Sequence, residues 1–201
     1  MITILNFFLR LIALIGLMLI SPLLIICSIL IVIENGFPVI FLQKRLGKNM
    51  KVFKIIKIRT MKKGTPNVGT HENIDSDFLR IGLLIRKFKL DEFPQLVNYI
   101  LGSINLVGPR PGLPNQVELK SARDQRNIFN VKPGITGLSQ VLGYDMSNPE
   151  LLSKVDAIYI KHYSILLDIT IFFATFLHPL RKMLHNRFEL DINEVEIIKN
   201  V

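Results

Sequence analysis

The sequence of 201 residues is poor in the groups that several classes of site require. Its one cysteine, Cys27, excludes an intrachain disulfide and fits a protein facing a reducing compartment. His71, Glu72, Asp75 and Asp77 follow a loop-like stretch, a surface loop or a lid, but their spacing matches no zinc site. No aromatic ladder accompanies the cations and no recognition-helix motif occurs, so we predict no nucleic acid partner.

Charge is absent from one long stretch near the N-terminus. Residues 11–33 carry no charged side chain and, at about 1.5 Å per helical residue, are long enough to cross a hydrocarbon core of about 30 Å. The stretch is too long for a cleavable signal peptide and lacks its cleavage pattern. Ser21-Pro22 lies in the middle, and a proline there kinks a helix. Composition favours a kinked spanning helix and leaves open a helix that enters one leaflet and returns.

The remainder is basic, with a formal net charge of +9, which predicts anionic partners. Residues 39–42 and 52–58 read as strands joined by a turn at 46–49. Nine lysines and arginines and no acid lie between positions 44 and 63. Adhesion to anionic lipid, worth about 1 kcal/mol per cation, explains most of them. Lys57 and Arg59 alternate with apolar residues on one strand face, which suits convergence on a phosphate.

Two adjacent carboxylates, Asp91 and Glu92, stand where we predict a second helix to begin after a first one at 78–88. Their simplest interpretation is an N-cap and a first-turn acid. An ionised carboxylate at such a place can also attack phosphorus, and two carboxylates with a diphosphate form an oxygen-rich site suited to Mg²⁺. Arg86 lies five residues before Asp91, and Arg110 is held between two prolines, which suits phosphate recognition.

The C-terminal third is less informative. Residues 123–130 read as polar and surface-facing, and 132–137 as a pair of turns. A helix is expected over 149–161, with Pro149 in its first position. Residues 168–178 are apolar but too short to span a bilayer, so they form either an interfacial helix or a core helix.

Five motifs in this order resemble the bacterial sugar transferase family, the monotopic polyprenyl-phosphate phosphoglycosyl transferases, from about Phe7 to about Phe176. They are Ser21-Pro22, FKIIKIRTM at 53–61, LDEFPQL at 90–96, LVGPRP at 106–111 and KPGITGLSQV at 132–141, with Asp156, Tyr159, Ser164 and Asp168 also at family positions.

The resemblance implies a reaction in which a nucleotide-diphosphate sugar, usually a UDP-sugar, gives its phosphosugar to a polyprenyl phosphate such as undecaprenyl phosphate. UMP is released and assembly of a surface glycan begins. The resemblance implies Asp91 as the nucleophile that carries the phosphosugar, Glu92 in metal binding or in handling the acceptor phosphate, and Mg²⁺ as cofactor. Arg59, Arg86 and Arg110 match cationic positions around the site.

The resemblance also implies an α+β fold, and the chain resembles the minimal form of the family. Residues 1–36 would be a re-entrant membrane helix broken at Ser21-Pro22, which reverses the preference from composition. Residues 37–186 would be a catalytic domain, with a small basic β-hairpin and helices packed on the cytoplasmic face of the bacterial inner membrane, and 187–201 a tail. Membrane lipids are expected partners, and a homodimer is left open.

Some positions depart from the family pattern. Lys89 replaces a common Ser or Thr, Arg59 stands where some relatives have Lys, and Gly143-Tyr144-Asp145 replaces Gly-Arg-Asn. These changes bear on the sugar, which the sequence does not specify, more than on the reaction class. The alternative function is a catalytically silent basic membrane-binding scaffold, which explains the cations and the apolar segment but not the acid pair. A membrane-tethered nucleic-acid binder lacks the aromatics it would need.

Overall fold

The computed structural model describes residues 2–65 and 77–197. His71, Glu72 and Asp75, with most of the loop-like stretch predicted before them, lie outside the described residues. The chain mixes helices and short strands, as the α+β prediction required. It divides into two compact units, Met1–Lys44 with Lys54–Ser103, and Arg45–Phe53 with Ile104–Val201. Each unit is described by itself.

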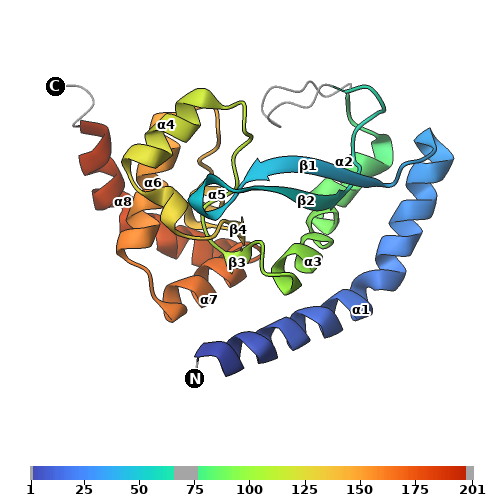
Figure 1. Ribbon diagram of the computed structural model, residues 1–201, viewed down its shortest axis with the longest axis horizontal. Helices are drawn as coiled ribbons and strands as arrows, with labels where there is room; N and C mark the ends of the chain where they lie inside the picture. The colour runs from blue at the N-terminus through green and yellow to red at the C-terminus, as the bar shows by residue number, and fades with distance from the viewer. Residues whose placement is uncertain (1, 66–76, 198–201) are drawn as a thin grey trace. The chain divides into compact units, whose positions relative to one another are not determined.

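The N-terminal apolar stretch forms one helix, α1 (Ile2–Asn35), which contains Pro22 without ending there. Figure 1 shows α1 changing direction part-way along its length. The Ser21 hydroxyl donates a hydrogen bond to the Met18 carbonyl, so the helix continues through the Ser-Pro pair with a side chain bonded to its own backbone. Among the described residues, this is the one helix long and apolar enough to cross a membrane.

Near its C-terminal end, α1 joins the core of the first unit. Cys27 and Ile31 pack with Ile58, Leu79 and Ile85 there, whereas most earlier side chains of α1 are exposed. The C-terminal end of the helix is therefore packed into the protein, whereas most of the preceding apolar side chains from position 7 on are exposed, although Ala13 is buried.

Two strands, β1 (Ile40–Leu46) and β2 (Val52–Ile58), form a two-stranded sheet around the short 3-10 turn η1 (Lys48–Met50). The predicted hairpin is confirmed, and β1 extends further than expected. The helix α2 (Arg80–Lys87) confirms the prediction for 78–88. Gly82 allows α2 to lie against the chain after β2, because a Cβ there would come within 2.2 Å of the Thr60 carbonyl oxygen.

The helix expected to begin near Asp91 requires correction. Residues Leu90–Glu92 form a 3-10 turn, η4, and α3 covers Gln95–Ile100 with Pro94 as its N-cap residue. Pro94 has no N–H with which to bond the Leu90 carbonyl, and Phe93 donates to that carbonyl instead at 3.4 Å. Asp91 is therefore the middle residue of a tight turn and does not cap an α-helix.

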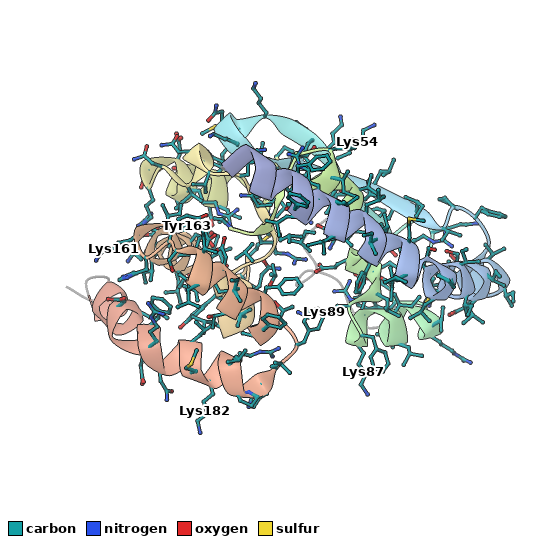
Figure 2. The ribbon with its side chains drawn as sticks, turned by 90° about the horizontal axis from the view of Figure 1, so that it is seen from below. Lys54, Lys87, Lys89, Lys161, Tyr163 and Lys182 are labelled. Atoms are coloured by element: carbon teal, nitrogen blue, oxygen red, sulfur yellow. The ribbon has the colours of Figure 1, made fainter. Side chains whose placement is uncertain are left out.

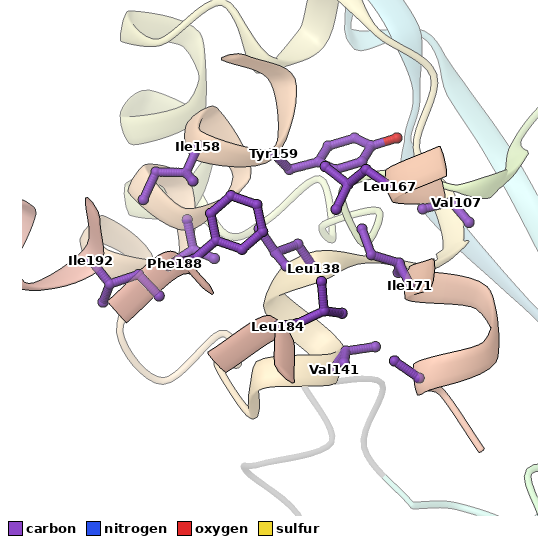
Figure 3. Packing of buried hydrophobic residues seen from close by; sticks show 12 residues of the cluster. Val107, Leu138, Val141, Ile158, Tyr159, Leu167, Ile171, Leu184, Phe188 and Ile192 are labelled. Carbon is purple, nitrogen blue, oxygen red and sulfur yellow. The ribbon is translucent and has the colours of Figure 1, made fainter. Parts of the chain in front are cut away.

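The second unit is built around a small parallel pair, β3 (Asn105–Val107) and β4 (Gly134–Thr136), in which Asn105 faces Gly134. Its helices are α4 (Val117–Gln125), α5 (Leu138–Leu142), α6 (Pro149–Lys161), α7 (Ile165–Ala174) and α8 (His178–Ile197), with the 3-10 turn η5 at Ile128–Asn130. Figure 3 shows their core, in which Leu138, Leu167 and Ile171 pack with residues of α6 and α8.

The helix predicted at 149–161 is confirmed as α6, and the Asn148 side chain caps it by accepting a hydrogen bond from the Leu151 N–H at 3.1 Å. The surface-facing interpretation of residues 123–130 is correct only in part, because Asp124, Gln125, Asn127 and Asn130 are exposed but three other residues are buried. Arg123 lies in α4 and is 3% exposed, and Ile128 and Phe129 are buried. The segment is polar in sequence, but the charge of Arg123 is buried beside Asp156, which lies far along the chain.

The apolar stretch at 168–178 falls mainly in α7, which has two unlike faces. Leu167, Ile171 and Ala174 are in the core, while Ile169 and Phe173 are exposed. The tail expected after position 186 continues as α8 and contributes Phe188 to the same core.

Candidate functional site

The turn η4 is placed by the end of α2. Lys89 adopts left-handed geometry (φ 56°, ψ 22°), which ends α2, and its N–H donates to the Arg86 carbonyl at 2.9 Å. A non-glycine residue in this region costs about 1 kcal/mol, so the surrounding contacts hold the turn in place. Asp91 is 6% exposed within the turn. Lys87 and Lys89 project from the end of α2 (Figure 2), which makes the neighbourhood of the carboxylates cationic.

Glu92, the second carboxylate, is paired with a cation from the sheet. Its Oε1 atom lies 2.9 Å from Nζ of Lys57 on β2, and both side chains are largely buried. Such a charge-assisted hydrogen bond fixes the orientation of the carboxylate. The two residues are 35 positions apart in sequence, and the fold brings these two predicted site residues together.

Asn98 on α3 holds β2 in register beside this turn. Its Oδ1 accepts from the Ile56 N–H at 3.0 Å and its Nδ2 donates to the Lys54 carbonyl at 2.8 Å. The side chain is 4% exposed and fixes the backbone immediately before Lys57. The sequence analysis did not single out Asn98, although an amide inside the apolar run Leu96–Leu101 is the signal that marks it.

Arg59 is directed elsewhere than Lys57. It is buried, and its Nη2 donates to the carbonyls of Gly36, at 2.5 Å, and Asn35, at the C-terminal end of α1. Cations are favoured at that end of a helix. Its Nε and Nη1 have no hydrogen-bond partner among the described residues, and burial lowers the pKa of the guanidinium. In this conformation Lys57 and Arg59 have different partners.

Arg86 lies in the last turn of α2 with its guanidinium over the Phe78 ring, 4.9 Å from the ring centroid. The start of the same helix is capped by α1, because the Glu34 carboxylate accepts from the N–H groups of Arg80 and Ile81 at 2.7 and 3.0 Å. Glu34, which the sequence analysis also did not single out, thus joins α1 to α2, the helix that carries Arg86.

Arg110 belongs to the second unit, in the turn that follows β3. Its carbonyl accepts a hydrogen bond from Arg123 at 2.7 Å. The other family-type positions have structural roles in the same unit. Asp156 forms a buried pair with Arg123, and the Tyr159 hydroxyl donates a hydrogen bond to Asp168 at 2.8 Å. Ser164 caps the start of α7.

The model of the family described as bacterial sugar transferase matches residues 3–182. The chain belongs to the bacterial sugar transferase family. The match covers both carboxylates, the basic hairpin, the Pro-Arg-Pro turn and almost all of α1.

Three relatives illustrate the range of this transferase family. A UDP-N-acetylgalactosamine-undecaprenyl-phosphate N-acetylgalactosaminephosphotransferase of Aeromonas hydrophila is 37% identical over 170 residues, which are 81% of this chain and 40% of the relative. A UDP-glucose:undecaprenyl-phosphate glucose-1-phosphate transferase of Caulobacter vibrioides is 34% identical, over 77% of this chain and 61% of the relative. The exopolysaccharide production protein PSS of Rhizobium leguminosarum bv. phaseoli is 32% identical, over 83% of this chain and 90% of the relative.

Proposed function

We propose that this chain transfers a phosphosugar from a UDP-sugar to a polyprenyl phosphate and releases UMP. The observation that carries the proposal is the buried Asp91 in its turn, with Glu92 ion-paired to Lys57 beside it, in a chain of the bacterial sugar transferase family. The names of the Aeromonas and Caulobacter relatives, which specify a UDP-sugar and undecaprenyl phosphate, support the choice of substrates.

In the proposed reaction, a carboxylate oxygen of Asp91 attacks the phosphorus that bears the sugar. A new oxygen–phosphorus bond forms, the bond to the bridging oxygen of the diphosphate breaks, and UMP leaves with that electron pair. A phosphate oxygen of the polyprenyl phosphate then attacks the same phosphorus and releases the Asp91 carboxylate unchanged. No redox partner is needed, and attack by ionised oxygens requires no general base.

The cations have distinct roles in this proposal. Lys57 orients Glu92, as its 2.9 Å contact supports, and offers positive charge to a phosphate oxygen. Arg86, at the end of α2, and Arg110, in the second unit, bind the substrate phosphates. Arg59 contributes through the two donor nitrogens that have no partner among the described residues, while its third nitrogen holds the end of α1.

Asp91 and Glu92 are the residues that would hold Mg²⁺. The described residues contain no group of three or more His, Cys, Asp and Glu side chains fit to hold a metal ion. Mg²⁺ is commonly bound by one or two carboxylates together with substrate phosphates and waters, and this pair fits such a site. When bound, the ion would neutralise charge on the diphosphate.

We propose further that α1 is re-entrant, with both ends on the cytoplasmic side of the bacterial inner membrane. Pro22 within the helix and the bend in Figure 1 support this topology. A cysteine placed at position 7, in a Cys27→Ser background, would be labelled by an impermeant maleimide in inverted membrane vesicles but not in intact spheroplasts. Labelling of the spheroplasts would establish a spanning helix.

Incubating the purified protein with a panel of UDP-sugars, polyprenyl phosphate and Mg²⁺ tests the reaction. We expect UMP release with at least one donor and its loss in Asp91→Asn, which keeps the size of the side chain but removes the nucleophile. With acceptor lipid withheld, mass spectrometry of the wild type would detect the phosphosugar adduct on Asp91. Salt-sensitive binding to liposomes without UMP release from any donor would favour the scaffold function.

A further inference from the structure

The Pro-Arg-Pro turn depends on hydrogen-bond donors from outside itself. Pro109 and Pro111 have no N–H, so the turn has few donors with which to satisfy its own carbonyls. All four carbonyls from 109 to 112 nevertheless accept hydrogen bonds. The donors are Gly134 N–H to Pro109 at 3.0 Å, Arg123 Nη1 to Arg110 at 2.7 Å, Arg45 Nη1 to Pro111 at 3.0 Å and Leu46 N–H to Gly112 at 2.9 Å.

Two of these donors are buried guanidinium groups. Arg45 is 5% exposed and Arg123 is 3% exposed. Arg123 is oriented by Asp156, whose Oδ2 accepts from its Nε at 3.0 Å and its Nη2 at 2.6 Å. The Ser139 hydroxyl donates to the other oxygen of Asp156 at 3.0 Å. This arrangement leaves Nη1 of the planar fork to reach the Arg110 carbonyl.

Burial of a guanidinium is costly, and a buried ion pair often adds little net stability. Pro109, Pro111 and Gly112 are buried, so the carbonyls of the turn need donors from the protein, but backbone N–H groups and neutral side chains ordinarily fill that role at lower cost. Placing two buried arginines on consecutive carbonyls is therefore better explained by a need to fix the position of the residue between the prolines. With its backbone held on both sides, the Arg110 side chain leaves from one defined point.

We propose that Arg123 and Arg45 are positioning residues for Arg110, which they hold by its backbone so that its guanidinium meets the phosphates of the donor. This inference rests on the proposed function, because it takes Arg110 to bind the nucleoside diphosphate. Asp156 and Ser139 act one step further out, by orienting Arg123.

A double-mutant cycle on the purified protein tests the proposal. Arg123→Lys retains a positive charge beside Asp156, but one ammonium group cannot replace the three-nitrogen fork. We expect it to raise the KM for the UDP-sugar about tenfold, with little change in the KM for polyprenyl phosphate. Because Arg123 acts through Arg110, the same substitution in an Arg110→Ala background should change the donor KM less than about twofold.

Arg126→Lys is the matched control. Arg126 is the C-cap residue of α4, and its side chain bonds Glu150 and the Ala122 carbonyl rather than the carbonyls of the Pro-Arg-Pro turn. Arg126→Lys should leave the KM for the UDP-sugar unchanged both in the wild type and in the Arg110→Ala background. If Arg123→Lys does not fold, as judged by circular dichroism, Arg45→Lys replaces it in the cycle, because that substitution weakens the hydrogen bond to the Pro111 carbonyl.

Equal effects of Arg123→Lys in the two backgrounds would overturn the proposal, because they would show a general structural role. An Arg110→Ala variant with the donor KM of the wild type would overturn it as well. Failure of the proposed function is distinguishable from both, because the wild type itself would then release no UMP from any donor.

Discussion

At the scale of single residues, the ion pair between Lys57 and Glu92 joins the carboxylate turn to β2. Lys57→Met removes the cation and leaves Glu92, whose side chain is 19% exposed, charged and without this partner. We expect a loss of about 1–3 kcal/mol in the free energy of unfolding. Urea denaturation measures it, and the double variant Lys57→Met/Glu92→Gln should recover part of the loss. No recovery would show that the loss does not come from leaving the Glu92 charge without this cation.

A second residue-scale prediction concerns pH. Burial raises the pKa of Asp168, and the hydrogen bond from the Tyr159 hydroxyl offsets this only in part. The folded protein therefore binds this proton more tightly than the unfolded chain does. The stability contributed by Asp168 is greatest below the unfolded pKa of about 3.9 and is lost as the pH rises through the folded pKa.

Asp168→Asn keeps an acceptor for Tyr159 without the charge. The Tm of the variant relative to that of the wild type should thus be higher at about pH 7 than at about pH 4. Thermal denaturation at the two pH values checks the sign, and Asp145→Asn, at an exposed position, is the control for a general loss of charge. A relative Tm that falls between about pH 4 and pH 7 would mean that the carboxylate is favoured in the folded state.

At the scale of elements, α2 approaches the chain after β2 so closely that the contact is sensitive to the size of the side chain at position 82. A Cβ on Gly82 would lie 2.2 Å from the Thr60 carbonyl oxygen, so Gly82→Ala must displace the helix that carries Arg86. We expect a loss of about 1–3 kcal/mol of stability, together with reduced UMP release. Gly16→Ala is the control, because nothing lies within 4 Å of its added Cβ. Similar stabilities for the two variants would contradict this packing.

The elements that could be predicted from sequence are those whose signal is local. An uncharged run gave α1, a basic alternating pattern gave the hairpin, and Asn148-Pro149 gave the start of α6. The errors arose where a partner that is distant in the sequence determines whether a side chain is buried. Arg123 reads as a surface charge because Asp156, which makes its burial tolerable, lies 33 residues away.

The candidate site was predictable to a similar extent. The sequence pattern singled out the carboxylates and the cations, but it paired Lys57 with Arg59, whereas the fold pairs Lys57 with Glu92. Strand alternation describes the direction in which a side chain leaves the backbone. It does not specify which distant element supplies the partner, and Asn98 and Glu34 were missed for the same reason.

At the scale of the whole molecule, we expect two forces to attract the protein to a membrane, and their dependence on salt concentration distinguishes them. The net charge of +9 attracts anionic lipid, but at 1 M salt the screening length falls to about 3 Å. The exposed apolar surface of α1 is not screened. We therefore expect the protein to float with vesicles of anionic lipid at both about 0.1 M and about 1 M NaCl.

Leu19→Lys makes this prediction specific to α1. Leu19 is 78% exposed near the middle of the apolar segment, where a lysine costs about 3 kcal/mol in a bilayer, so vesicle binding by the variant should become salt-sensitive. Val117→Lys on α4, where the valine is 74% exposed, adds the same charge and should leave binding salt-resistant. Release of the wild type by salt would mean that it adsorbs by charge alone, because an inserted apolar helix has no charge for salt to screen.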